Sequence, residues 1–204
     1  MYALSPLQSD ALCEIFNISV GQAANAMSSM VNEEVLLNVP RIDFLSRDEA
    51  ARVIDGSGQQ RICSVSQNFE GEFTGEAMLM FPEENSLEIV RLMIGKTIPL
   101  SHMTELEQDA LSEVGNIILN ACVSTLSDLL RHDFTCSLPI LRFGTGKSVF
   151  AEAAATEQDV VMFLQIEFQI EQLNTRGYLV FLVDIPTIDN LKRGIDRFLG
   201  GMPS

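Results

Sequence analysis

The sequence predicts an α+β fold, in which a largely antiparallel sheet is covered by two long helices and two shorter ones. Apolar residues recur at helical spacing over two long runs, residues 6–32 and 105–130, while the segments between them have the pattern of short strands separated by turns. The order helix, strand, loop, hairpin, helix occurs twice. We therefore expect one internally duplicated, pseudo-twofold domain over residues 1–204, built from repeats at about 5–96 and 104–201.

The first repeat opens with a helix whose start is marked by Ser5 as the N-cap and Pro6 in the first turn. The strand that follows contains Pro40, which favours the edge of a sheet or a bulge, because proline cannot donate a ladder hydrogen bond. A polar stretch then predicts a loop, and a Glu-Gly turn between two strand-like runs predicts a hairpin. The expected elements are the helix 6–32, the strand 35–45, the loop 47–60, the strands 61–69 and 72–81, and the helix 82–95.

The second repeat follows the same order. Its long helix begins after Thr104, and its first strand again contains a proline, Pro139. The expected elements are the helix 105–130, the strand 134–143, a loop or short helix 144–156, the strands 159–170 and 176–184, and a helix from 186 to 200. An internal pseudo-twofold of this kind is compatible with a monomer.

The composition is that of a globular protein, with 47% hydrophobic and 20% charged residues. The net charge of −15 argues against nucleic acid and anionic lipid as partners, because an acidic surface repels both. No apolar run reaches the length of a membrane span, and the first residues lack the basic and apolar regions of a secretory signal. The four cysteines form no Cys-x-x-Cys pair, so we expect free thiols in the core and a cytoplasmic location.

One polar pattern is repeated half a chain apart. Asp10, Glu14 and Asn17 stand in the first long helix, with Pro40 in the strand behind it. The same residue types recur 99 positions later as Asp109, Glu113, Asn116 and Pro139. On a helix, positions i+4 and i+7 lie within about 40° of position i. Each copy therefore forms one polar stripe that faces either solvent or a partner.

A solvated helix face is one interpretation of such a stripe. The repeated identities favour a functional one, because several other polar residues would serve a solvated face as well as Asn17 does. The carboxylate of Glu can bind a cation, and the amide of Asn can hold a water at a fixed place and orientation. The stripe offers no nucleophile and no metal-ligand set. It predicts water positioning, which is the main requirement of phosphoryl transfer.

The pattern Asp/Ser-x3-Glu-x2-Asn-x22-Pro, present twice, resembles the CheC/CheX/FliY phosphatases of chemotaxis. Both copies match at every specified position, and the motifs with the elements between them cover nearly the whole chain. Two motifs in one chain differ from CheX, and the lack of an additional flagellar-switch domain differs from FliY. The chain is therefore most similar to a stand-alone CheC.

The resemblance implies that the chain dephosphorylates a phospho-aspartyl response regulator of the CheY type. In that family the Glu of the motif pairs with the regulator's active-site lysine, and the Asn enters that site and orients the attacking water. The implied catalytic residues are Glu14 and Asn17 in one copy and Glu113 and Asn116 in the other. The Mg²⁺ and the phosphoryl group belong to the regulator, so no cofactor or metal of the chain's own is implied.

The other motif residues have supporting roles in this interpretation. Asp10 and Asp109 are expected to support the pair or to contact the partner, and the two prolines to shape the strand behind each helix. Gly115 stands where Phe16 does, between Glu and Asn, and we expect this difference to change how closely a partner approaches. The second copy is therefore expected to be the more active.

A binding module from a different class stays open. The chain could act as an adaptor that docks a phosphorylated regulator without hydrolysing it, or that binds a receptor deamidase of the CheD type, with which CheC-like proteins are linked. The sequence does not choose between these partners. The decay of the phosphorylated regulator would separate an enzyme from an adaptor.

Overall fold

The computed structural model describes residues 4–56, 60–94, 104–153, 160–170 and 173–200. Over these residues the chain forms six helices and seven strands, and all the strands join one antiparallel sheet, which confirms the predicted α+β class. The helices are α1 (Pro6–Val31), α2 (Arg47–Asp55), α3 (Glu83–Ile94), α4 (Glu105–Leu130), α5 (Gly146–Glu152) and α6 (Ile185–Gly200). The strands are β1 (Val35–Leu45), β2 (Ile62–Glu70), β3 (Thr74–Pro82), β4 (Thr135–Cys136), β5 (Ile140–Gly144), β6 (Val160–Ile170) and β7 (Leu173–Val183).

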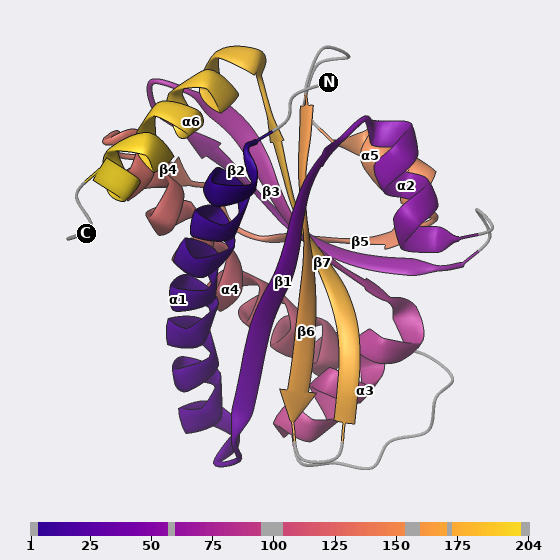
Figure 1. Ribbon diagram of the computed structural model, residues 1–204. Coiled ribbons are helices and arrows are strands. Elements are labelled where there is room, and N and C mark those ends of the chain that lie inside the picture. The colour runs from indigo at the N-terminus through magenta and orange to yellow at the C-terminus, as the bar shows by residue number, and fades with distance from the viewer. Residues whose placement is uncertain (1–3, 57–59, 95–103, 154–159, 171–172, 201–204) are drawn as a thin grey trace.

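The sheet interleaves the two halves of the chain (Figure 1). Its order is β1-β6-β7-β3-β2-β4, and β5 also pairs with β2. Thus β1 of the first half pairs with β6 of the second, while β4 and β5 of the second half pair with β2 of the first. The central β3–β7 pair joins the halves. Each strand on one side of the sheet therefore has a counterpart at the same place on the other side.

Helices cover both faces of the sheet. Alternate residues of β3 point to opposite faces, as the two-residue period of a strand requires: Ala77 and Leu79 join one core, and Met78 and Met80 join the other. The larger core lies between the sheet and the helices α1, α3, α4 and α6. The smaller one lies under α2 and α5, which pack together on the other side (Figure 1). The sheet is thus the middle of three layers.

The two long helices begin and end in equivalent ways. The side chains of Ser5 and Thr104 cap α1 and α4, and in both cases the side chain three residues later completes a capping box. Both helices are 26 residues long and end at a residue in the left-handed conformation, Asn32 with φ 55° and Arg131 with φ 61°. These matched boundaries place the two motifs at the same turn of their helices.

The prediction of a loop over residues 47–60 is wrong, because its first nine residues form α2. Ser46 caps this helix: its hydroxyl accepts a hydrogen bond from the backbone of Glu49, whose carboxylate accepts one from the backbone of Ser46. Ala50 and Ile54 are buried and attach the helix to the smaller core. Local capping and one narrow apolar stripe are enough to form a helix that is polar in composition.

The predicted strand over residues 134–143 is interrupted. β4 ends at Cys136 and β5 begins at Ile140, with Pro139 in the break. The other motif proline, Pro40, lies in β1, where the register with β6 shifts. Pro40 thus lies in an outermost strand at a bulge, and Pro139 lies between two short strands that pair with β2, which confirms the prediction of an edge or a bulge.

Candidate functional site

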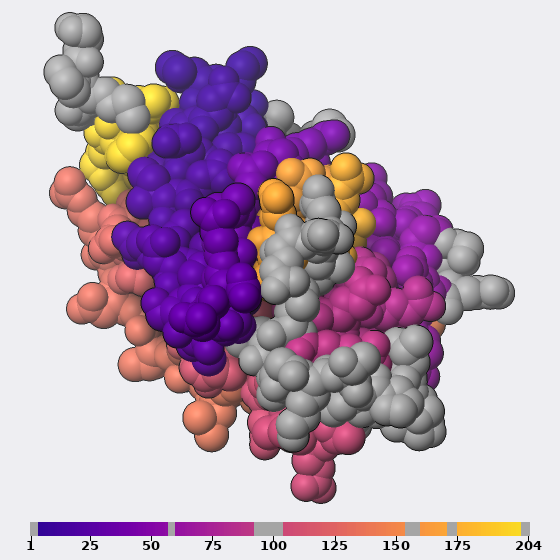
Figure 2. Space-filling model, turned by 90° about the horizontal axis from the view of Figure 1, so that it is seen from below, coloured from indigo at the N-terminus to yellow at the C-terminus, as the bar shows by residue number. Residues whose placement is uncertain are grey.

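The two motifs lie on the outer faces of α1 and α4. Asp10 and Glu14 of α1 are exposed, and Asn17 is half-buried where the helix meets β1. The α4 residues have the same burial: Asp109 and Glu113 are exposed and Asn116 is half-buried. Figure 2 shows α1, in indigo, on the outside of the molecule with α6, in yellow, beside it. The carboxylates of both stripes are therefore accessible to another protein.

The carboxylates of the two motifs stand apart from the cations that the structure describes. In the described part of the chain, no Lys, Arg or His forms an ion pair with Glu14, Glu113 or the two motif aspartates. An exposed carboxylate without a partner keeps its full charge available for a cation that approaches from solution. The structure thus presents two glutamates that are free to pair with a basic side chain of another molecule.

Asn17 is held by the backbone of β1. Its Oδ1 accepts a hydrogen bond from the N–H of Val39 at 2.7 Å, and its Nδ2 donates to the C=O of Val39 at 3.1 Å. In the register of β1 with β6, Val39 and Pro40 together stand opposite the single residue Ile166. The amide of Asn17 satisfies backbone groups that the strand ladder leaves out at this bulge. The 22-residue spacer of the motif therefore ends at the residue that Asn17 binds.

Asn116 has different partners. Its Oδ1 accepts hydrogen bonds from Gln67 Nε2 at 3.1 Å and from Asn120 Nδ2 at 2.9 Å. Gln67 Nε2 also donates to the C=O of Ser137 at 3.0 Å. Because a carbonyl oxygen can only accept, the Gln67 atom that faces Ser137 is its NH₂, and the Asn116 atom that faces Gln67 is therefore the oxygen. Among the described residues nothing accepts from Asn116 Nδ2, so its NH₂ group is available to a water or a partner.

Gly115 and Phe16 lie on the buried faces of their helices, so a partner meets neither residue directly, and the expectation that they change its approach stays a prediction. Phe16 packs against Phe181, with ring centroids 5.8 Å apart. A Cβ added to Gly115 would lie 2.4 Å from Cγ1 of Val65 in β2. The glycine lets α4 pack on β2, whereas α1 packs mainly on β1. The helix that carries the second motif is therefore supported by β2, and the helix that carries the first motif is supported by β1.

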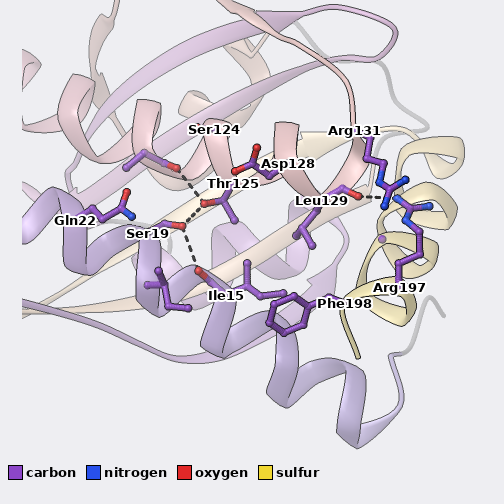
Figure 3. A pocket seen from close by; sticks show the side chains of 13 residues that line it. Ile15, Ser19, Gln22, Ser124, Thr125, Asp128, Leu129, Arg131, Arg197 and Phe198 are labelled. Carbon is purple, nitrogen blue, oxygen red and sulfur yellow. Dashed lines mark hydrogen bonds between the residues drawn. The ribbon is translucent and has the colours of Figure 1, made fainter. Parts of the chain in front are cut away.

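The two motifs form separate sites. α1 and α4 meet where the hydroxyl groups of Ser19 and Thr125 are hydrogen-bonded. In Figure 3, Gln22 and Ser124 lie at one end of this contact, and Ile15 and Leu129 lie at the other. The helices therefore run in opposite directions along the contact. The first turns of α1 and of α4, which carry the motifs, lie at opposite ends of the helix pair.

The groove between α1, α4 and α6 has a volume of about 400 Å³ (Figure 3). Ile15, Ile18 and Phe198 give it an apolar wall, and Arg131 and Arg197 add positive charge. Arg197 Nη2 donates a hydrogen bond to the C=O of Leu129 at 2.9 Å, which ties α6 to the end of α4. None of the motif residues lines this groove, so it is not part of the candidate site.

Other reactive groups lie away from the motifs. Within the described ranges, no group of three or more His, Cys, Asp and Glu residues could hold a metal ion, and no helix is long and apolar enough to cross a membrane. All four cysteines are free thiols, as expected. Cys63 and Cys122 are buried, but Cys136 is exposed and Cys13 half-buried, so the expectation that all four lie in the core is wrong. Desolvation by burial raises the pKa of Cys63 to about 12.

The helix pattern identifies the motif residues but not the groups that hold them. Gln67 and Asn120, which bind Asn116, were not predicted as site residues, and neither was Val39. A signal for Gln67 exists in β2, where Cys63, Val65 and Phe69 point alternately into the larger core and Gln67 is the polar exception. Val39 contributes through its backbone, which a side-chain pattern cannot reveal.

Comparison with known proteins agrees with the motif. A family model described as the CheC-like family matches residues 7–42, which contain the first motif with Pro40. The chain is 26% identical over 194 residues to the CheY-P phosphatase CheC of Bacillus subtilis, covering 90% of this chain and 91% of that protein. It is also 26% identical over 139 residues to the flagellar motor switch phosphatase FliY of Bacillus subtilis, covering 67% of this chain and 35% of that protein.

Solved structures with the same fold support the relationship. The structure of Thermotoga maritima FliY superimposes with a TM-score of 0.78 at 19% identity, covering 96% of this chain and 99% of that one. A CheC-like superfamily protein from Shewanella sp. PV-4 gives a TM-score of 0.52 at 17% identity, covering 84% of this chain and 97% of that one. At these identities the likeness concerns the fold alone. The resemblance to the CheC/CheX/FliY family is thus confirmed by the sequence matches, and the solved structures show the same fold.

Proposed function

We propose that the chain is a phosphatase that acts on a phosphorylated, CheY-like chemotaxis response regulator in the cytoplasm. The observation that carries the proposal is the duplicated surface pair: Glu14 with Asn17, and Glu113 with Asn116, each on an outer helix face. The glutamates form no ion pair with any described residue, and a relative that covers most of the chain bears the name CheY-P phosphatase. These features together favour a site that is completed by another protein.

In each pair, the Glu and the Asn would have different roles. The Glu carboxylate binds the lysine of the regulator's active site and so fixes the docking position. The Asn amide then holds a water in line with the phosphoryl group, which shortens the path to attack without a covalent intermediate on this chain. Mg²⁺ stays with the regulator. Asp10 and Asp109 lie one turn earlier and contribute negative charge to the docking face.

The two copies of the motif are proposed to contribute unequally to hydrolysis. Asn17 uses one donor and one acceptor on the backbone of Val39, which fixes its amide against β1. The NH₂ group of Asn116 forms no hydrogen bond with described residues. An amide whose oxygen is held and whose NH₂ is free is better prepared to orient a water. We therefore assign most of the hydrolysis to Glu113 and Asn116.

The engaged state of Asn17 gives the adaptor hypothesis one supporting observation. A first copy that docks a regulator through Glu14 but has a fixed Asn would bind without fast hydrolysis. In that case the chain would hold one regulator and dephosphorylate another. The first copy would then raise the local concentration of substrate for the second.

The experiment is to follow the decay of a phosphorylated CheY-like regulator and, in parallel, its binding to the chain. The variants are Glu14→Ala/Asn17→Ala, Glu113→Ala/Asn116→Ala, and all four changes together. We expect the second pair to remove most of the acceleration and the first pair to remove less. If the wild-type chain binds the phosphorylated regulator but leaves its lifetime unchanged, the chain is an adaptor and not a phosphatase.

A further inference from the structure

We propose that Gln67 is a positioning residue for Asn116, and that it makes the second motif competent for water orientation. The inference rests on the proposed phosphatase function and extends it to a residue outside the motif. Gln67 lies in β2, in the first half of the chain, whereas Asn116 lies in α4, in the second half. The interleaved sheet is what brings them together.

The position of Gln67 in the core makes its polarity unexpected. It is 2% exposed, and its neighbours on the same face of β2, Val65 and Phe69, belong to the larger core. Its Oε1 is buried and has no hydrogen-bond partner among the residues that the structure describes. A buried polar group that is left unsatisfied destabilises a fold, so its presence calls for a function. The function visible in the structure is the pair of hydrogen bonds that its Nε2 donates.

The first motif has no glutamine behind it at the position that corresponds to Gln67. Inward-facing residues of β2 and β6 correspond at the 99-residue offset of the motifs, so that Val65 matches Leu164 and Phe69 matches Phe168. Gln67 then matches Ile166, which is fully buried and apolar. In the first copy no side-chain amide stands behind the bulge, and Asn17 turns to the strand backbone instead.

Asn120 completes the arrangement. It lies one helical turn after Asn116 and donates the second hydrogen bond to Asn116 Oδ1. At the same offset the first repeat has Gly21, which has no side chain. Two amide donors occupy both lone pairs of the Asn116 oxygen, so the only hydrogen-bonding group left on that side chain is its NH₂. The orientation of Asn116 is thereby fixed from two sides.

Gly115 explains how the contact is reached. Because this residue has no side chain, α4 lies against Val65 of β2, and the next inward residue of that strand, Gln67, then meets the next residue of the helix, Asn116. In the first repeat the corresponding residue is Phe16, which is buried and packs against Phe181. Gly115, Gln67 and Asn120 thus together fix the position of the Asn116 amide.

The test uses Gln67→Met, which keeps the volume and removes the donor, in a background where Glu14→Lys disables docking at the first copy. Decay of the phosphorylated regulator is measured as a function of its concentration, so that kcat and KM are separated. We expect kcat to fall by about ten- to a hundredfold with little change in KM, because misplacement of an orienting group acts on the chemical step. Asn116→Ala in the same background is the reference for complete loss of phosphatase activity at the second copy.

A structural readout separates positioning from stability. Gln67→Met removes an Oε1 that has no partner among the described residues, but it also removes the two hydrogen bonds that Nε2 donates, so it is expected to unfold at a urea concentration close to that of the wild type. The side-chain NH₂ resonances of Asn116 should shift in the ¹⁵N–¹H spectrum of this variant even without regulator. Gln67→Ile introduces the residue that stands at the corresponding position behind the first motif. It should have the same effects as Gln67→Met on urea unfolding and on the Asn116 resonances.

The outcomes are distinguishable. If Asn116→Ala abolishes activity while Gln67→Met leaves kcat unchanged, the phosphatase assignment stands and the role of Gln67 is wrong. If Gln67→Met raises KM alone, Gln67 affects docking and the positioning role is also wrong. If the Glu14→Lys protein itself does not accelerate decay but the wild type does, the second copy is inactive and the inference fails. If the wild type has no effect on decay, both proposals fail together.

Discussion

The side-chain amide of Asn17 pairs with the backbone of Val39 through two hydrogen bonds, with its oxygen accepting from the N–H and its nitrogen donating to the C=O. In the first copy this contact joins the asparagine of the motif to the residue before its proline. The proline that follows has no N–H to satisfy. The same spacing in the second copy joins different partners, because there Gln67 lies between Asn116 and the strand.

Asn17 should therefore matter for stability as well as for activity. Replacing it with alanine leaves the N–H and C=O of Val39 without their partners at a half-buried site, and we expect a loss of about 1–3 kcal/mol in the free energy of unfolding. Asn116→Ala should cost less, because Asn120 is exposed to water and Gln67 Nε2 keeps its hydrogen bond to the C=O of Ser137. Urea unfolding of the two variants checks the order. A larger loss for Asn116→Ala than for Asn17→Ala would contradict it.

Gly115 and Gly21 form a matched pair of helical glycines. A Cβ at Gly21 meets nothing within 4 Å, whereas a Cβ at Gly115 would lie 2.4 Å from Cγ1 of Val65. Gly21→Ala should therefore stabilise the protein by up to about 1 kcal/mol through helix propensity alone. Gly115→Ala should destabilise it by about 1–3 kcal/mol, since the contact overpacks the core.

The contact with Val65 can be isolated by a double-mutant cycle. In the Val65→Ala background, the loss caused by Gly115→Ala should shrink, because the two methyl groups of Val65 are gone and only its Cβ, at 2.6 Å, remains close. Thermal or urea unfolding of the four proteins gives the coupling free energy. Additive effects of the two substitutions would show that α4 does not lie against Val65 in solution.

Stability should fall at alkaline pH because of the buried thiols. Burial raises the pKa of Cys63 from 9.0 to about 12, and it raises the pKa of Cys122 as well. The unfolded state releases these protons first, so the contribution of each thiol is complete below about pH 9 and is lost as the pH rises towards the folded-state pKa. The slope reaches about 1.4 kcal/mol per pH unit for one thiol.

The matched variant for this effect is Cys63→Ala. Its free energy of unfolding should depend less steeply on pH between about 9 and 12 than that of the wild type, because one proton fewer is released on unfolding. Urea unfolding at several pH values in this range measures both slopes. Equal slopes would mean that the Cys63 thiol is not desolvated in the folded state.

Much of the fold follows from the sequence because its signals are local. The long helices have caps, helical periodicity and left-handed ends, and their predicted bounds agree with α1 and α4 to within one residue. The hairpins have alternating runs and turn residues. The helix α2 also had a local signal, the Ser46–Glu49 capping box, but its mostly polar composition resembles that of a loop.

The pairing between the halves and the supports of the motif have no such local signal. The sequences of β1 and β6 do not show that these two strands pair. A strand with one buried face can pair with any other strand of the same pattern. The hydrogen bond from Gln67 to Asn116 links residues 49 positions apart and depends on the packing of α4 on β2. Such contacts become visible only when the repeats are compared in three dimensions.

The most direct test of the account is the rate at which a phosphorylated CheY-like regulator loses its phosphoryl group in the presence of Glu14→Lys/Glu113→Lys. Both glutamates are exposed and form no ion pair with described residues, so the fold should be unaffected, as circular dichroism can verify. The account predicts that the wild type accelerates the loss and that the double variant leaves the regulator at its intrinsic rate, because like charges now repel at the docking face. A double variant that accelerates the loss as well as the wild type would contradict it.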